Sequence, residues 1–385
     1  MRTWYPDVPT SEHMCEWTSK PMKVLLINND KGWSGGQEHL KDLAGELGRL
    51  GVEVQFVVRA GSRSDTSFRE LGVPVHSLPG HGLGDIKALF QLVRLLRRER
   101  FDIVSVNREH DLFLTALAWH LAFPLRKPGK LMMSYHTSTS RRQLLLGSAD
   151  AILCISEHVR TKLLQGNPAV ADKVSVIYHG IALGVAPAAG KFDRNRPRRF
   201  FTGEGFPLIG MVGEFWKNQG ELIGMIPTLR QAFPGIKVAF VGDNTDEWLI
   251  TPIMTQVRDL GLEDAVIFTG RLPRERIPDV FYDFDLSVTT HRNEGFGIVH
   301  LESLAAGTPV VTYDEGGMVD IFQGEDIGKV VTGGSAEFTA AVIDLLQDDE
   351  RRFSLGRNGY DLVKRQYSLA SMGRRYLEYY RNMLG

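Results

Sequence analysis

The sequence reads DLSVTT at residues 285–290, NEGFGIVHLE at 293–302 and SLAAGTPVVT at 303–312. The first run has the composition of a short strand, and the apolar residues after Gly297 recur at helical spacing rather than in alternation. Gly307 and Pro309 then end the helix, and a second apolar run starts at Val310. The stretch therefore predicts a strand, a glycine-rich turn, a helix and a second strand.

The turn and the helix that follows it have the chemistry of a ligand site. A helix that begins just after two glycines presents unpaired backbone N–H groups and the positive end of its dipole, which favours an anion. Glu294 lies in the turn and Glu302 lies slightly more than two helical turns further on. Carboxylates accept hydrogen bonds from sugar hydroxyls. The stretch thus favours a sugar joined to a diphosphate; the alternative is an ordinary β-α-β unit with two surface glutamates.

The same string carries a family resemblance. Glu294-Gly-Phe-Gly-x4-Glu302, followed by GTPVV from Gly307 and by Gly316-Gly317, resembles the Glu-x7-Glu signature of retaining glycosyltransferases of family 4. The resemblance covers nearly all of residues 22–385 and is strongest over 266–317. It implies an α/β protein of the GT-B fold. Two Rossmann-like domains with parallel sheets would face each other across a cleft, and a C-terminal helix would cross back to the first domain.

The composition of the chain argues against several other classes of protein. A chain of 385 residues with 43% hydrophobic and 24% charged residues fits two globular domains. The net charge of −1 gives no electrostatic footprint for nucleic acid. Two cysteines offer neither a disulfide framework nor metal-ligand spacing. No apolar run approaches the roughly 18 residues of a membrane span, and the first 21 residues lack a signal-peptide core, so we expect a cytoplasmic protein.

The predicted domains follow from shifts in composition and from the resemblance. Residues 1–21 are expected to be a loose extension, 22–183 the N-terminal acceptor domain and 207–365 the C-terminal nucleotide-sugar domain. Residues 184–206, rich in proline, glycine and arginine, are expected to form an exposed linker. Residues 366–385 are expected to be a helix that packs back on the N-terminal domain.

The resemblance assigns the donor site residue by residue. Gly35 and Gly36 would face the donor diphosphate, and Lys217 would neutralise it. Glu214 stands where the family has an arginine, so either Glu214 turns away or another base, such as Arg271 or Arg292, takes that role. The segment after Gly270 would meet the nucleobase. The donor-binding residues implied in this way are Gly35, Gly36, Lys217, Arg271, Leu272, Glu294, Gly295, Phe296, Gly297, Ile298, Val299 and Glu302.

Polar residues at strand ends of the first domain supply further candidates. His136 ends a predicted strand where the family has a histidine that contacts the donor sugar, although a lone histidine is more often structural. Asn107 and His110 follow another strand and are acceptor-side candidates. Ser156-Glu157 matches the family's strand that ends in Ser-Glu, and His179 is expected to be a polar group on the hinge side.

The resemblance also implies a reaction. A sugar would pass from a nucleotide-diphosphate sugar, UDP- or GDP-type, to a hydroxyl of a glycan or lipid-linked acceptor, with retention of anomeric configuration. Glu294, His136 and Lys217 form the implied catalytic set, Glu302 would hold the ribose, and no metal or other cofactor is implied. The expected pathway is cell-envelope polysaccharide or lipopolysaccharide synthesis.

Residues 86–100 combine an apolar face with many basic residues. Such a basic amphipathic helix can lie on an anionic membrane. The alternative is a helix that covers a sheet and keeps a solvated basic side. The expected apolar face comprises Ile86, Leu89, Phe90, Val93 and Leu96.

Other functions stay open at this point. A sugar-nucleotide epimerase or hydrolase on the same fold would turn over donor without an acceptor. A non-catalytic sugar-nucleotide-binding protein is compatible with Glu214. A dehydrogenase is disfavoured, because no dinucleotide fingerprint with its downstream acidic residue occurs.

Overall fold

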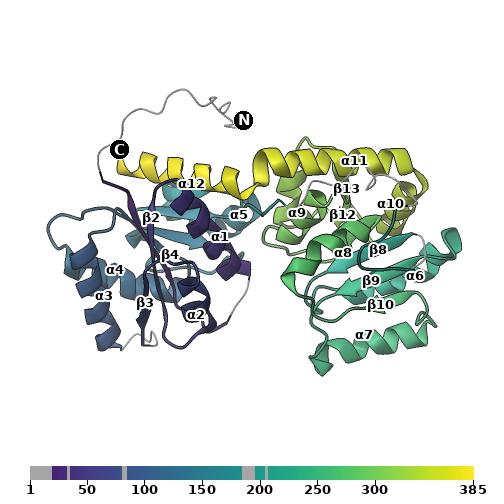
Figure 1. Cartoon of the computed structure of the whole chain (residues 1–385), viewed down its shortest axis with the longest axis horizontal. Helices are drawn as coiled ribbons and strands as arrows, with labels where there is room; N and C mark the ends of the chain where they lie inside the picture. The colour runs from purple at the N-terminus through teal and green to yellow at the C-terminus, as the bar shows by residue number, and fades with distance from the viewer. Residues whose placement is uncertain (1–19, 33–34, 80–84, 184–195, 204–206) are drawn as a thin grey trace.

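A computed structural model describes residues 20–32, 35–79, 85–183, 196–203 and 207–385. It contains two α/β domains, which Figure 1 shows side by side with helices on both faces of each sheet. Most of the predicted extension at 1–21, and residues 184–195 and 204–206 of the predicted linker, lie outside the described residues.

The first domain is built on a parallel seven-stranded sheet with the order β3-β2-β1-β4-β5-β6-β7. The order reverses between β1 and β4, and ligands bind at such a switch point, at the carboxyl ends of the strands. The strands are β1 (Lys23–Asn28), β2 (Glu53–Arg59), β3 (Val75–Leu78), β4 (Ile103–Val106), β5 (Lys130–Tyr135), β6 (Ala151–Cys154) and β7 (Val174–Val176). The helices are α1 (Gly35–Arg49), α2 (Arg63–Arg69), α3 (Ile86–Glu99), α4 (Glu109–Ala122) and α5 (Glu157–Gly166).

The second domain repeats this plan with a parallel six-stranded sheet in the order β10-β9-β8-β11-β12-β13. Its switch point lies between β8 and β11. The strands are β8 (Leu208–Val212), β9 (Lys237–Val241), β10 (Val266–Phe268), β11 (Leu286–Thr289), β12 (Val310–Tyr313) and β13 (Gly328–Val331). The helices are α6 (Gln219–Ala232), α7 (Glu247–Asp259), α8 (Ile277–Asp283), α9 (Ile298–Ala305), α10 (Ser335–Gln347) and α11 (Asp349–Leu362), and the 3₁₀ turn η5 spans Gly317–Phe322.

The strand, glycine turn, helix and strand predicted for residues 285–312 are confirmed as β11, α9 and β12. The carboxyl end of β11, and with it the turn that carries Glu294, lies at the switch point of the second sheet. The fold therefore puts this turn where open parallel sheets bind their ligands.

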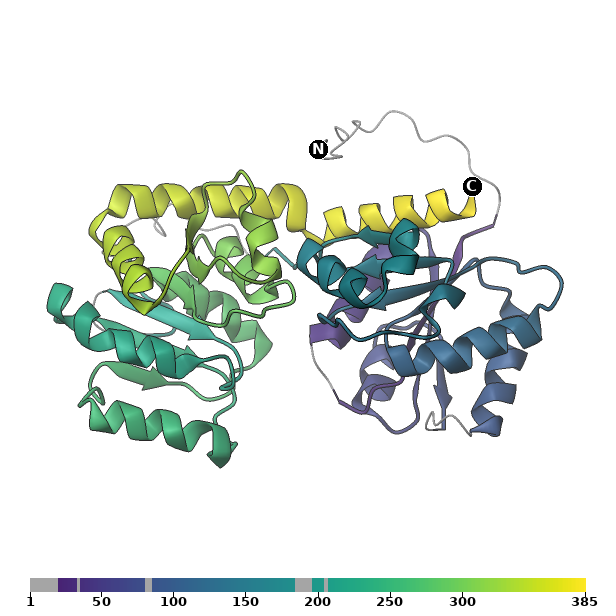
Figure 2. The ribbon, with the colours of Figure 1, turned by 180° about the vertical axis from the view of Figure 1, so that it is seen from behind.

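The last helix, α12 (Leu369–Leu384), returns to the first domain. It follows α11 through a π-helical turn, Val363–Tyr367. Both views show α11 lying on the second domain and α12 on the first (Figures 1 and 2). Tyr376 and Tyr380 share one buried cluster with Leu40 and Leu43 of α1. The predicted architecture, including the returning helix, is confirmed.

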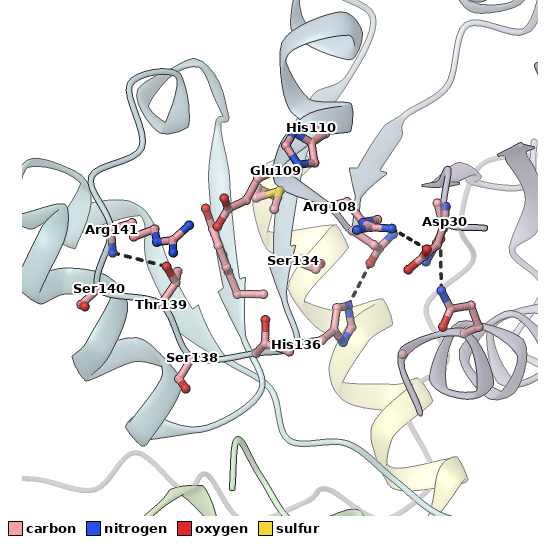
Figure 3. A pocket seen from close by; sticks show the side chains of 17 residues that line it. Asp30, Arg108, Glu109, His110, Ser134, His136, Ser138, Thr139, Ser140 and Arg141 are labelled. Carbon is pink, nitrogen blue, oxygen red and sulfur yellow. Dashed lines mark hydrogen bonds and ion pairs between the residues drawn. The ribbon is translucent and has the colours of Figure 1, made fainter. Parts of the chain in front are cut away.

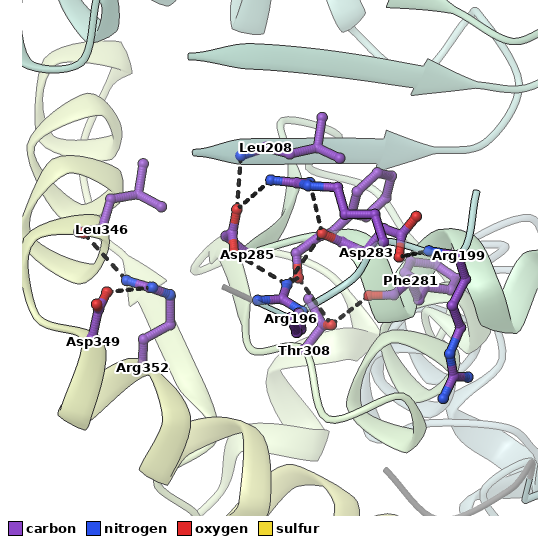
Figure 4. A network of polar contacts seen from close by, with 12 residues as sticks. Arg196, Arg199, Leu208, Phe281, Asp283, Asp285, Thr308, Leu346, Asp349 and Arg352 are labelled. Carbon is purple, nitrogen blue, oxygen red and sulfur yellow. Dashed lines mark hydrogen bonds and ion pairs between the residues drawn. The ribbon is translucent and has the colours of Figure 1, made fainter. Parts of the chain in front are cut away.

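The described end of the predicted linker is packed against the second domain (Figure 4). Arg196, whose side chain is only 4% exposed, lies 3.1 Å from the Asp285 carboxylate. The Asp283 carboxylate accepts backbone N–H bonds of 2.7 to 2.8 Å from residues 199–201. The expectation of exposure is wrong for Arg196 and Arg198, because the buried Asp285 carboxylate pairs with both guanidinium groups, which also donate to the Asp283 backbone carbonyl. The domain boundaries themselves stay predictions.

The inward face of α3 also differs from the predicted one. Leu92 and Leu95 are buried, whereas Ile86 and Phe90 are 66% and 70% exposed. Val93 and Leu96 are buried as predicted. The helix thus covers its sheet and leaves two large apolar side chains in solvent. Within the described residues, no helix is long and apolar enough to span a membrane.

Candidate active site

Helix α9 begins directly after Gly297, in a backbone conformation that favours glycine. Gly297 occupies the N-cap position with φ of +90°, a left-handed conformation that glycine adopts without strain. The first N–H groups of such a helix have no partner within the helix, so they are available to an anion. A Cβ on Gly35 would lie 4.0 Å from the Ile298 side chain. The start of α1 and the start of α9 therefore face each other across the two domains, as expected for a diphosphate site.

Lys217 and Glu294 form an ion pair beside this turn. The Lys217 ammonium lies 2.6 Å from the Glu294 carboxylate, and the two side chains are 15% and 24% exposed. Burial opposes ionisation of Glu294, but the charge and hydrogen bond of Lys217 outweigh it, so the pKa of this carboxyl lies below its ordinary value. The pair presents an ionised acceptor for hydroxyls next to an ammonium group.

Glu214 stands where the family has an arginine, and among the described residues no other arginine takes that arginine's place beside Lys217 and Glu294. Glu214 is exposed, and its carboxylate has no ion pair or hydrogen bond there. Arg292 lies 2.7 Å from Glu315 and 3.5 Å from the centre of the Tyr313 ring. Arg271 is 67% exposed and lies 3.9 Å from Asp243. Neither arginine contacts the Lys217–Glu294 pair, so Lys217 is the cation that this geometry offers.

Glu302 lies further along α9, against the first domain. Its carboxylate is 3.7 Å from the Arg274 guanidinium. Burial raises the pKa of Glu302, Arg274 opposes this, and the nearby carboxylates Asp42 and Glu38 of α1 raise it further. Sequence reasoning did not include Arg274 or Asp42, because nothing in the local pattern links them to Glu302. Glu302 and Arg274 line a cavity of about 510 Å³ between α8, α9 and the segment at Ile181.

His136 belongs to a buried cluster with His39 and His179. The Asn107 amide donates to the Ile27 carbonyl at 3.2 Å, which turns its oxygen toward His136 Nε2 at 3.1 Å. His136 Nε2 therefore carries the proton, and Nδ1 accepts a 3.2 Å bond from His179 Nε2. Burial lowers the pKa of His136 to about 4, and it also lowers the pKa values of His39 and His179. All three rings are neutral near pH 7.

The arrangement of these rings is that of a hydrogen-bonded cluster. One ring nitrogen from each of the three lies within 4.8 Å of the other two. However, the His39 and His179 rings stack 3.8 Å apart at an angle of 6°, so their in-plane lone pairs run side by side and do not meet at one ion. His39 Nε2 lies 3.2 Å from the hydroxyl of Tyr376 on α12. Sequence reasoning missed His39, although it follows the Gly35-Gly36 loop by one helical turn.

The two acceptor-side candidates share one cavity with His136 (Figure 3). This cavity of about 620 Å³ opens at the carboxyl ends of β1, β4 and β5. Arg108 pairs with Asp30 at 2.6 Å at its edge, and Arg141 lies on the opposite wall. The polar lining residues include Asn28, Asp30, Gln37, Asn107, Glu109, His110, Ser134, His136, Thr139 and Arg141.

The Phe296 side chain packs against the first domain, a role that the sequence motif alone does not indicate. Its side chain is 2% exposed and stacks on Tyr178 at 5.5 Å between ring centres. It also meets the His179 ring edge-on at 5.9 Å. Because the ring is buried against the first domain, only the backbone of Phe296 is left to contact a donor.

Two facing Rossmann-like domains, with a helix start free to receive an anion and a carboxylate–ammonium pair at the switch point, form the arrangement expected of an enzyme that binds a sugar nucleotide. The family models "Glycosyltransferase Family 4" and "Glycosyl transferases group 1" match residues 33–184 and 194–362, respectively. The chain belongs to this family of retaining, nucleotide-sugar glycosyltransferases. The resemblance read from the Glu294 motif is confirmed.

Individual relatives are distant but extend over most of the chain. The D-inositol 3-phosphate glycosyltransferase of Corynebacterium kroppenstedtii is 25% identical, over 92% of this chain and 86% of its own. The capsular polysaccharide biosynthesis glycosyltransferase CapM of Staphylococcus aureus is 24% identical, over 74% and 77%. The crystal structure of Anabaena HepE in complex with UDP superposes with a TM-score of 0.79 at 21% identity, over 94% and 100% of the two chains. This last likeness shows the fold.

Proposed function

We propose that this glycosyltransferase moves a sugar from a UDP- or GDP-type donor to a hydroxyl of a glycan or lipid-linked acceptor in cell-envelope polysaccharide or lipopolysaccharide synthesis. The observation that carries the donor site is the Lys217–Glu294 pair of 2.6 Å beside the start of α9, opposite Gly35. UDP in the Anabaena structure and capsule synthesis by CapM support the donor and pathway classes.

In the proposed reaction the bond between the anomeric carbon and the β-phosphate oxygen breaks, and its electron pair stays on the phosphate. The acceptor oxygen attacks from the same face, and its proton passes to the departing phosphate. An ammonium group has three donors, so Lys217 can hold Glu294 and also stabilise the phosphate charge. The N–H groups at the start of α9, and those of Gly35 and Gly36 at the start of α1, add to this stabilisation.

The carboxylates have binding roles in this proposal. Glu294, held ionised by Lys217, accepts hydrogen bonds from hydroxyls of the transferred sugar, and Glu302 accepts them from the ribose. His136 is neutral and uses both ring nitrogens in hydrogen bonds. It therefore acts in this arrangement as a positioning group rather than as a free base, and Asn107 and His110 line the cavity proposed for the acceptor.

A thermal-shift screen against UDP-, GDP-, ADP-, dTDP- and CMP-sugars tests the donor site. Ligand at about 100 times its dissociation constant adds roughly 2.7 kcal/mol to the free energy of unfolding. We expect a shift with one nucleotide that is lost in Glu302→Ala and kept in Glu315→Ala, a more exposed carboxylate that pairs with Arg292. A screen without any shift contradicts the donor assignment.

A second candidate, a non-catalytic sugar-nucleotide-binding protein, is favoured by Glu214. A carboxylate in place of a cation leaves fewer positive charges at the diphosphate, where charge develops during transfer. Donor binding without turnover over a panel of glycan and lipid-linked acceptors would support this candidate, and release of the nucleotide diphosphate in the presence of an acceptor would exclude it.

We further propose that the surface formed by α3 and the end of α4 contacts an anionic membrane, where a lipid-linked acceptor would lie. Phe90, 70% exposed, stands beside Arg94, Arg97 and Arg98 along a groove of about 540 Å³. Arg97 donates to the Leu121 carbonyl at 2.8 Å, which puts the exposed Leu121 next to this group. Exposed apolar side chains among basic residues are typical of interfacial helices. The cytoplasmic compartment expected from the sequence stays a prediction.

A further inference from the structure

The first turn of α5 carries a serine whose hydroxyl makes two hydrogen bonds in opposite directions. Ser156 Oγ accepts the backbone N–H of Val159 at 3.0 Å, as the N-cap of α5 in the first domain. The same oxygen donates to the carbonyl of Gly295 in the second domain at 2.6 Å. Gly295 directly follows Glu294, so a first-domain hydroxyl binds the backbone next to the carboxylate of the donor site.

A carboxylate of the second domain binds the same helix start. Asp320, on η5, accepts the Glu157 backbone N–H at 2.6 Å. A helix N-terminus carries partial positive charge, so an acidic group from the other domain is a favourable cap there. Two hydrogen bonds therefore join the start of α5 to the second domain. One runs from the Glu157 N–H to Asp320, and the other from the Ser156 hydroxyl to the Gly295 carbonyl.

The turn is closely packed against η5 on one side and is in van der Waals contact with the first domain on the other. The Gly317 N–H donates to the Glu294 carbonyl at 2.8 Å. A Cβ on Gly317 would lie 2.0 Å from the Gly295 carbonyl oxygen and 2.7 Å from Ser156 Oγ. A Cβ on Gly295 would lie 3.5 Å from the His136 carbonyl oxygen. The Glu294 turn is thus enclosed between η5 and the first domain, and its backbone position depends on both.

We infer that Ser156 and Asp320 are positioning residues, which bring the Glu294 carboxylate into its place beside Lys217 only when the two domains are docked. This inference rests on the proposed function, in which Glu294 holds the transferred sugar. A displacement of about 1 Å at a reacting group can cost roughly 100-fold in rate. Docking of the domains and readiness of the donor site are therefore coupled through the backbone of residues 294–295.

Four variants separate this role from helix capping. Ser156→Ala removes both bonds, whereas Ser156→Asp keeps an acceptor for the Val159 N–H but cannot donate to Gly295. Asp320→Asn keeps an acceptor for the Glu157 N–H, and Asp320→Ala does not. Ser62→Ala is the matched control, because Ser62 caps α2 by accepting the Asp65 N–H at 3.3 Å, within the first domain.

In steady-state transfer assays we expect Ser156→Ala, Ser156→Asp and Asp320→Ala to lower kcat by at least tenfold, with a change of less than threefold in the donor KM. Ser62→Ala and Asp320→Asn should keep kcat within threefold of the parent. Equal kcat values for Ser156→Ala and Ser62→Ala, or recovery of the parent kcat by Ser156→Asp, would overturn the inference.

Amide hydrogen exchange gives a readout that does not require turnover. We expect faster exchange over residues 291–297 and at the Gly317 amide in Ser156→Ala and Asp320→Ala, and no change in Ser62→Ala. Unchanged exchange in both variants would overturn the positioning role. A parent protein that transfers no sugar, but whose turn responds in this way, would contradict the proposed function and leave the positioning role supported.

Discussion

The Lys217 ammonium lies 2.6 Å from the Glu294 carboxylate, and this contact joins the two sides of the switch point in the second sheet. Lys217 follows β8 and Glu294 follows β11, neighbouring parallel strands between which the strand order reverses. The ion pair therefore forms at the carboxyl ends of these strands, where open parallel sheets bind their ligands, and each partner fixes the orientation of the other.

The first prediction concerns this pair. Lys217→Ala should lower kcat by roughly 100- to 1000-fold, the usual cost of removing one preorganised group at a developing charge. Glu294→Ala should have a comparable effect, because it removes the acceptor for the sugar hydroxyls and the partner that orients Lys217. The double variant should be little worse than the poorer single variant, because the two groups act as a unit. Arg365→Ala, which removes an ion pair with Glu325, is the control. Normal turnover in both single variants would contradict the assignment of Lys217 and Glu294 to the active site.

The second prediction concerns Gly297. Gly297→Ala puts a Cβ at φ of +90°, 2.6 Å from His300 Cδ2. The left-handed conformation should cost about 1–2 kcal/mol of stability, and the overpacking roughly 1–3 kcal/mol more. Gly261→Ala, at φ of +62° with no atom within 4 Å, should show only the first cost. Urea denaturation measures both; equal costs for the two variants would contradict the packing at His300.

The third prediction concerns acid stability. Burial lowers the pKa values of His39, His136, His179 and His300, with His136 and His300 at about 4. Their folded-state pKa values lie below the unfolded value of about 6.5, so the unfolded chain binds more protons as the pH falls from 6.5 toward 4. Stability should therefore fall over this range, by up to about 1.4 kcal/mol per pH unit for each ring.

The change of the urea midpoint with pH measures this effect. His300→Leu should flatten the dependence between pH 6.5 and pH 5, because one buried neutral ring is removed. His110→Leu, at an exposed position, should leave the slope unchanged. A parent protein whose midpoint is constant from pH 7.5 to pH 5 would show that these histidines are not held neutral by burial.

The fourth prediction concerns the α3 surface. The protein should sediment with vesicles of phosphatidylglycerol but not with vesicles of phosphatidylcholine alone. Arg94→Ala should weaken this binding about fivefold, since one basic residue near an anionic surface contributes about 1 kcal/mol. Phe90→Ser should weaken it as well. Arg351→Ala, at a basic position of α11 in the second domain, should have no effect. Equal binding to both vesicle types would contradict the proposed surface.

Features encoded by neighbouring residues could be predicted from the sequence. The order of β11, the glycine turn, α9 and β12 follows from apolar periodicity and from Gly307 and Pro309, so its elements lie where the pattern put them. The returning helix could be predicted in the same way, with help from the resemblance. These signals are local, because the spacing of side chains on one helix or strand fixes which face is buried.

Contacts between distant parts of the chain could not be predicted. Ser156 and Gly295 are 139 residues apart, and His39 and Tyr376 are 337 apart. Arg196 looked exposed because its neighbours are polar, but Asp285, 89 residues later, binds it in the core. Phe90 looked buried because it shares a helical face with Val93 and Leu96, yet the sheet reaches only part of that face. Tertiary packing decides such cases, and one sequence does not show it.

The return of α12 to the first domain has a consequence for synthesis of the protein. The apolar face of α1, with Leu40, Leu43 and Ala44, is translated well before the residues that cover it. The residues that cover this face, Met372, Tyr376 and Tyr380, are translated more than 300 residues later. During elongation the hydrophobic face of α1 therefore stays uncovered until α12 has been made. In this interval chaperones, or other nascent chains, could bind that face.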